Sequence, residues 1–90
     1  MNNQDKLEKI IAHYGHEEQL WQCVEELTEC SLALMHHAKD KYSNHHEEIA
    51  DALIMLEQMR LIYGPRNIDA LIEMKLDRTM QRIEDVNSGS

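Results

Sequence analysis

Phenylalanine is absent from this 90-residue sequence, and the chain has only one proline, three glycines and one tryptophan. The commonest residues are instead helix formers, chiefly Leu, Ile, Met, Glu and Ala. The composition therefore predicts an all-α fold. Few aromatic side chains are left for stacking on a ligand, and we expect each of them to pack in a core or an interface: Tyr14, Trp21, Tyr42 and Tyr63.

Cysteine is also scarce, with Cys23 and Cys30 lying seven residues apart in strongly helical sequence. At the helical rise of about 1.5 Å per residue they are roughly 10 Å apart, which is too far for a disulfide within one helix. The pair also lacks C-x-x-C spacing. We therefore expect two small buried hydrophobic residues in a reducing compartment.

Positively charged residues are also few. The chain has nine Lys and Arg residues against 17 Asp and Glu residues, which gives a net charge of −8. This balance argues against direct binding to polymeric nucleic acid or to an anionic membrane. No apolar run approaches the roughly 18–20 residues needed to span a bilayer, and the N-terminus shows no signal-peptide pattern. We therefore expect a cytoplasmic protein.

The helical pattern predicts one domain over residues 1–86 and a flexible tail over 87–90. Four helices are expected, at about Asn3–Tyr14, His16–Ala38, 44–63 and Ile68–Val86. Their ends are marked by Gly15, by a Ser43 or Asn44 cap, by Gly64-Pro65 and by an Asn67 cap. A chain of this length has a thin core, so we expect a four-helix bundle that is completed by oligomerisation.

The third helix is apolar nearly all round. Ile49, Leu53 and Leu56 mark one stripe, while Glu48 and Asp51 begin a second that continues into Met55, Met59 and Ile62. Such a helix is usually buried on several sides, which favours a second subunit. On the fourth helix we expect Ile68, Ile72, Leu76, Met80 and Ile83 to face the core, with Lys75, Arg78 and Arg82 along one edge.

Two acidic clusters are the most informative feature of the sequence. Glu25-Glu26-x-x-Glu29 lies on the second helix and Glu48-x-x-Asp51 on the third, and a step of three residues returns to nearly the same helix face. If the two helices pack antiparallel, these carboxylates converge, and their repulsion must be neutralised. A hard divalent cation, Mg²⁺ or Mn²⁺, suits an all-oxygen site. The alternative is an ordinary solvated acidic face.

With these two clusters the sequence resembles the MazG-like nucleotide pyrophosphatases, of the all-α NTP pyrophosphatase superfamily. The resemblance rests on the E-E-x-x-E and E-x-x-D motifs, on Lys75-Leu76-Asp77-Arg78, and on the Gln-rich segment before the first motif. It covers residues 14–83, and the length matches the compact phage-type and bacterial stand-alone members. The resemblance implies Mg²⁺-dependent hydrolysis of a nucleoside triphosphate between its α- and β-phosphates by a homodimer or homotetramer.

Residue roles follow from the resemblance, motif by motif. It implies that the metal ligands are Glu26, Glu29, Glu48 and Asp51, and that Glu25 either adds a ligand or activates water together with Glu26. Lys75 and Arg78 would contact phosphates, and Gln19, Trp21 or Gln22 would face the base. The resemblance leaves the base, the sugar and the number of ions open.

The six histidines raise one further possibility, a transition-metal site. His36-His37 and His45-His46 bracket the connection between the second and third helices, where Zn²⁺ or Ni²⁺ is conceivable, although adjacent residues on a helix point about 100° apart. We expect surface histidines. Two further function classes also stay open: a non-enzymatic helical interaction module, and a di-iron bundle, which would need Glu-x-x-His pairs that the motifs do not provide.

Overall fold

The computed structural model describes residues 1–88, and this range contains four α-helices and no β-strand. The helices are α1 (Asn3–Tyr14), α2 (His16–Ala38), α3 (His45–Tyr63) and α4 (Pro65–Ser88). The predicted all-α class is confirmed, and the predicted bounds of the first two helices agree with the structure. None of these helices is both long enough and apolar enough to cross a membrane.

Local signals explain where the helices begin and end. The Asn2 side chain caps α1 by accepting a 2.8 Å hydrogen bond from the backbone N–H of Asp5. Gly15 and Gly64 have φ angles of 92° and 114°, a backbone region that residues with a side chain rarely adopt, and each separates two helices by a single residue.

The fourth helix is longer than predicted at both ends. It begins at Pro65 rather than Ile68, because proline suits the first turn, where its missing N–H is not needed. The predicted Asn67 cap is therefore wrong, since Asn67 lies inside the helix. The helix also continues through Ser88, two residues beyond its predicted end at Val86, while positions 89 and 90 of the predicted tail lie outside the described residues.

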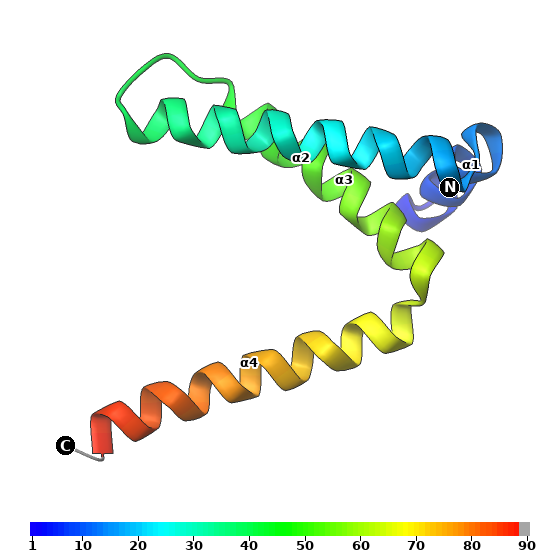
Figure 1. The fold of residues 1–90 in the computed structure, drawn as a ribbon. Helices are drawn as coiled ribbons and strands as arrows, with labels where there is room; N and C mark the ends of the chain where they lie inside the picture. Colours follow the sequence, from blue (N-terminus) through cyan, green and yellow to red (C-terminus); the bar gives the residue numbers. More distant parts are fainter. Residues whose placement is uncertain (89–90) are drawn as a thin grey trace.

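The antiparallel pair of α2 and α3 forms the centre of the molecule (Figure 1). Small or flexible side chains fill the interface and let the helices approach: Cys23, Ala33, Ala52 and Met55 are all buried. A polar pair lies among them, because Gln19 Nε2 donates a 2.7 Å hydrogen bond to Gln58 Oε1. Pairing the two amides satisfies polar groups that would otherwise be costly to bury.

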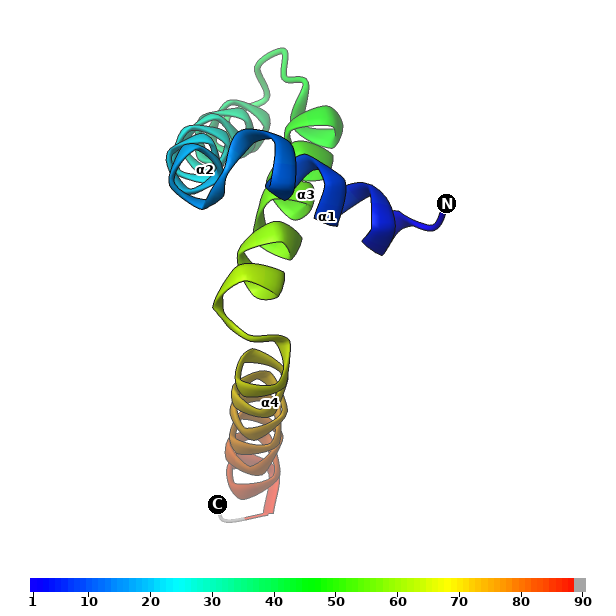
Figure 2. The same cartoon turned by 90° about the vertical axis from the view of Figure 1, so that its right-hand side faces the viewer.

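The first helix crosses α3 near the start of α2, whereas α4 extends away from the other helices beyond its junction with α3 (Figures 1 and 2). Its contacts with the rest of the chain are with α3, at the elbow between the two helices. Arg60 links α3 to α4 at this elbow through hydrogen bonds. Its Nε and Nη2 atoms donate to the two carboxylate oxygens of Asp69, at 2.7 and 2.6 Å, and Nη1 donates to Glu57 at 2.8 Å.

The apolar stripe of α4 does not face a core within one chain, so that prediction is wrong for the single molecule. Every residue from Asp69 through Asn87 is exposed, and Leu76 keeps 59% of its surface accessible. The molecule is correspondingly extended, with a radius of gyration of 17.0 Å. A compact domain of the same length would have about 12 Å. The predicted bundle is therefore not closed by one chain.

The long apolar stripe of α2 is also left open. Leu20, Val24, Leu27 and Leu34 remain 38–46% exposed, because α2 meets α3 through the neighbouring face that carries Cys23 and Ala33. On α3, Leu53 and Leu56 are 61% and 44% exposed. Viewed along each helix from its N-terminus, both stripes are rotated from the α2–α3 interface in the same direction. Because the two helices are antiparallel, this rotation places both stripes on the same side of the hairpin. The hairpin thus has an apolar side and, opposite it, an acidic side.

Candidate metal centre

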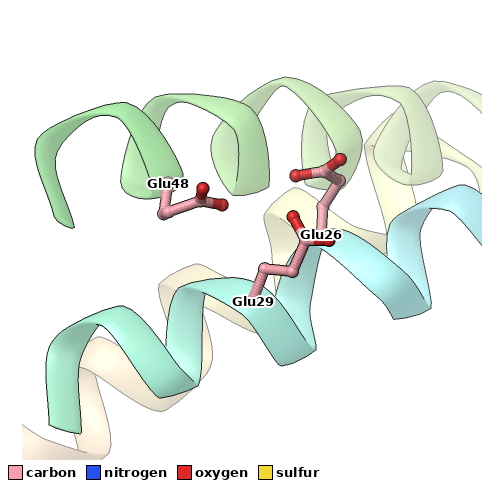
Figure 3. Close-up of side chains that lie close together, drawn as sticks. All are labelled: Glu26, Glu29 and Glu48. Atoms are coloured by element: carbon pink, nitrogen blue, oxygen red, sulfur yellow. The ribbon is translucent and has the colours of Figure 1, made fainter. Parts of the chain in front are cut away.

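Three glutamates from two helices converge at the α2–α3 interface. Glu26 and Glu29 extend from α2 and Glu48 from the first turn of α3, and their carboxylates project into the space between the helices (Figure 3). One oxygen atom from each lies within 4.8 Å of the others. Glu26 shares the packed face of α2 with Cys23 and Ala33, and Glu48 precedes Ala52 by one turn, so helix packing itself brings these acids together.

Two side-chain amides orient the half-buried carboxylates. Gln22 Nε2 donates to Glu26 Oε1 at 3.1 Å, and Asn44 Nδ2 donates to Glu48 Oε1 at 2.9 Å. In each glutamate the other oxygen, Oε2, is buried and has no hydrogen-bond partner. A buried oxygen without a donor is unfavourable, and a cation would satisfy both at once. The donor set therefore fits a hard metal ion.

The third carboxylate, Glu29, is exposed and shows the repulsion within the cluster. Its pKa is raised above the ordinary glutamate value, mainly by the negative charge of Glu26, then by partial desolvation, and further by Glu48, Glu25 and Asp51. All the charged groups that shift this pKa are carboxylates. The negative potential at the cluster therefore favours a proton or, at neutral pH, a metal cation.

The two other predicted acids lie beside the three glutamates. Asp51 is exposed and, with Glu26, Ile54 and Met55, lines a small cavity of about 150 Å³. Glu25 is exposed on α2 and acts on Glu29 through its charge. The structure thus brings the five predicted acids into one neighbourhood, with Glu26, Glu29 and Glu48 as the tight group. An all-oxygen set of this kind suits Mg²⁺ or Mn²⁺.

The predicted phosphate-binding residues do not reach this cluster in the same chain. Lys75 and Arg78 are exposed on α4, which has no contact with α2 and meets α3 only through the elbow.

The residues predicted to face the base are dispersed. Gln19 is buried and its amide bonds to Gln58, and Gln22 bonds to Glu26, whereas Trp21 is 62% exposed on α2. Sequence reasoning missed the orienting roles of Gln22 and Asn44. The sequence does contain a signal for these roles, because an amide side chain lies four residues before Glu26 and before Glu48, a spacing at which side chains on one helix meet.

Three of the six histidines, His37, His45 and His46, lie together where the loop joins α2 to α3. His37 and His45 stack with ring centroids 4.0 Å apart and an interplanar angle of 28°, and His46 lies 4.4 Å from His45. The pKa of His45 is lowered, first by desolvation and then by the charges of His37 and His46. Stacked rings direct their nitrogen lone pairs along nearly parallel planes, which do not converge on one ion. The geometry therefore suits packing better than chelation.

The cysteines are both free thiols. Cys23 is buried as predicted, and burial raises the pKa of its thiol, while Cys30 is half-buried.

Comparison with known proteins found no matching family model, no matching curated protein and no matching solved structure. The carboxylate cluster and its surroundings are therefore the basis for a functional proposal.

Proposed function

We propose that the protein is a Mg²⁺-dependent nucleoside triphosphate pyrophosphohydrolase of the MazG-like type, with Mn²⁺ as a possible substitute. The observation that carries this proposal is the group Glu26, Glu29 and Glu48, in which two carboxylates are held by amides and leave a buried oxygen without a donor. An all-oxygen group of this kind suits a hard cation.

In the proposed reaction, water adds to the α-phosphorus of a nucleoside triphosphate. The bond from the α-phosphorus to the α–β bridging oxygen breaks, giving a nucleoside monophosphate and pyrophosphate. When bound, a divalent cation supplies a Lewis acid that neutralises phosphate charge. The residues of the chain hold the cation through Glu26, Glu29, Glu48 and Asp51, and Glu25 or Glu26 accepts the proton of the water.

The small cavity beside Glu26 supports a role for more than one copy of the chain. Its volume of about 150 Å³ lies below the range of roughly 300–1,000 Å³ that is typical of ligand pockets. One chain alone therefore provides the carboxylates without the walls of a nucleotide pocket. We propose a homodimer or homotetramer in the cytoplasm, consistent with the open apolar faces of α2, α3 and α4.

A second candidate function is a non-enzymatic interaction module that keeps the helical fold. The extent of exposed apolar surface on α2 and α4 favours it, because large exposed apolar patches mark interaction sites. Metal binding separates the two candidates, because an interaction module gives no reason for the cluster to bind Mn²⁺ tightly.

The test is release of monophosphate and pyrophosphate from a panel of nucleoside triphosphates, including dUTP and the common deoxynucleotides, with Mg²⁺, with Mn²⁺ and with EDTA. We expect metal-dependent release that the Glu48→Gln and Asp51→Asn variants abolish without loss of helicity. Glu47→Gln is the matched control, because Glu47 neighbours Glu48 but is not among the groups that shift the pKa of Glu29. Near-wild-type turnover by both site variants would overturn the assignment.

A further inference from the structure

Helix α4 has little tertiary support within one chain, because it contacts only α3. From Asp69 through Asn87 every residue of this 24-residue helix is exposed, and the bond from Arg60 to Asp69 lies at its N-terminal end. Most helical stability in proteins comes from packing an apolar face rather than from helix propensity alone. Yet α4 has such a face, with Ile72, Leu76 and Ile83 each about half exposed or more. Something must cover it.

The surface area indicates how much is uncovered. The chain exposes 7197 Å² for a mass of 10.6 kDa. A compact monomer of that mass exposes about 5,500 Å², so the excess is roughly 1,700 Å². A standard protein interface buries about 800 Å² on each partner. The excess is therefore large enough for a stable interface, and a second copy of the chain provides a matching excess of its own.

Charge indicates where the helix would dock. Four of the nine basic residues of the chain lie on α4, and Lys75, Arg78 and Arg82 follow one edge of its apolar stripe. Within one chain these cations are remote from the carboxylate cluster, because α4 has no contact with α2 and meets α3 only at the elbow. A helix with an apolar stripe and a cationic edge is complementary to an apolar groove beside an acidic site.

The chain has such a groove. It lies between α1 and α3, has a volume of about 480 Å³, and takes its apolar walls from Leu7, Ile10, Leu53 and Ile54. Ile54 also lines the small cavity that Glu26 and Asp51 share. A helix seated in this groove would therefore border the carboxylates. The chain's own α4 does not occupy it, because α4 contacts neither α1 nor α2.

We propose that two copies of the chain exchange α4, so that each α4 packs in the groove between α1 and α3 of its partner and brings Lys75 and Arg78 to the partner's carboxylate cluster. The elbow held by Arg60 and Asp69 directs α4 away from its own hairpin (Figure 1) and leaves it accessible to a second copy. This inference deepens the proposed function and rests on it for the role of the two cations, while the exchange of helices does not depend on catalysis.

The exchange is tested first by molar mass in solution, measured by light scattering during size-exclusion chromatography at micromolar concentration. We expect the wild type to be a dimer, or a tetramer built from such dimers. Leu76→Glu on α4 and Leu53→Glu in the groove should each shift the mass toward the monomer, although both side chains are exposed in one chain. Tyr42→Glu, which is 93% exposed in the loop before α3, is the matched control and should keep the wild-type mass. A monomeric wild type would overturn the proposal.

Completion of the site in trans is tested by mixing two inactive variants, Glu48→Gln and Lys75→Ala/Arg78→Ala, after unfolding and joint refolding. If α4 acts on the partner, a mixed dimer combines intact carboxylates from one chain with intact cations from the other. Random pairing then restores about a quarter of the wild-type sites. If α4 acts on its own chain, no site is restored. A mixture of Glu26→Gln with Glu48→Gln is the control, because it restores no site in either arrangement.

The outcomes separate the two proposals. Hydrolysis by the wild type without recovery in the mixture overturns completion in trans and leaves the proposed function standing. A dimeric wild type that loses its dimer in the Leu76→Glu and Leu53→Glu variants but hydrolyses no triphosphate supports the exchange and overturns the proposed function. Dimers that persist in both variants overturn the exchange itself.

Discussion

Two amide side chains decide how the glutamates of the cluster are presented. Gln22 and Asn44 each lie four residues before the glutamate that they bond, and each holds Oε1 so that Oε2 turns to the interior. At metal sites, groups that orient ligands commonly affect affinity almost as much as the ligands do. The sequence predicts Ser43 or Asn44 as the cap of α3. Asn44 takes the N-cap position, but its side chain makes no capping hydrogen bond and bonds to Glu48 instead.

We therefore expect Gln22→Ala and Asn44→Ala each to weaken Mn²⁺ binding by about 10- to 100-fold while leaving the helical content unchanged. Titration calorimetry with Mn²⁺ measures the affinity. Gln4→Ala is the matched control, because Gln4 makes the same kind of bond to Glu8 on α1, at 3.2 Å, away from the cluster. Equal affinities for all three variants would contradict an orienting role.

A buried hydrogen bond between two glutamines lies in the α2–α3 interface. The bond between Gln19 and Gln58 fixes the antiparallel alignment, and ten residues along each helix from this pair lie Glu29 and Glu48. A buried polar pair costs stability if either partner is lost, and an apolar pair of similar size can be neutral. The two glutamines therefore specify which residues face each other more than they add to stability.

From this we expect Gln58→Leu alone to lower the free energy of unfolding by about 1–3 kcal/mol, because the Gln19 amide is then buried without its partner. The double variant Gln19→Leu/Gln58→Leu should regain most of that loss while binding Mn²⁺ more weakly than the wild type, since the register is no longer fixed. Urea denaturation and a Mn²⁺ titration report the two quantities. Additive losses in the double variant would show that the amides act independently.

Repulsion inside the cluster gives the same helix pair a pH dependence. The pKa of Glu29 is raised in the folded state, so the folded protein binds this proton more tightly than the unfolded chain does. Its contribution to stability is therefore fully present below the ordinary glutamate pKa and is lost as the pH rises through the raised value.

Compared with the wild type, Glu29→Gln should accordingly be more stable at neutral pH, and the difference should shrink toward about pH 4. Mg²⁺ should remove the same repulsion, so it should stabilise the wild type more than it stabilises Glu29→Gln. The comparison between the two proteins is needed because His45, whose pKa is lowered, changes stability in the opposite direction in mildly acidic solution. A difference that grows in acid would contradict the assigned cause.

How far the sequence could predict the structure differs from helix to helix. The spans of α1 and α2 follow from glycine punctuation and helix propensity, and the convergence of the acids follows from two i, i+3 spacings on antiparallel helices. The packed face of α2 could not be read from hydrophobicity. The longest apolar stripe, with Leu20 and Leu27, stays half exposed, and the smaller Cys23 and Ala33 meet α3. Hydrophobic periodicity identifies faces that need a partner without saying which partner covers them.

At the scale of the whole molecule, an incomplete core and an incomplete site have the same explanation. The chain has an open apolar helix, an extended shape and a carboxylate cluster that its own α4 does not reach, and each of these is resolved if α4 packs on a second copy. Short chains commonly compensate for a small core by associating. The bundle predicted from the sequence would then be a property of the dimer, which explains why four helices do not close around one core in a single chain.

If the apolar face of α4 is buried only in the dimer, the stability and helix content of the protein must depend on its concentration. On dilution through the dissociation range, we expect α4 to unfold, so the circular dichroism signal at 222 nm should fall while the α2–α3 pair remains helical. The melting temperature should rise with protein concentration, as it does whenever association stabilises only the folded state. Leu76→Glu should show the low-concentration signal at every concentration, and Tyr42→Glu should follow the wild type. A helical signal and melting temperature that stay constant over a hundredfold dilution, from a protein with monomer mass, would mean that α4 is stable on its own, and the need for a partner would disappear.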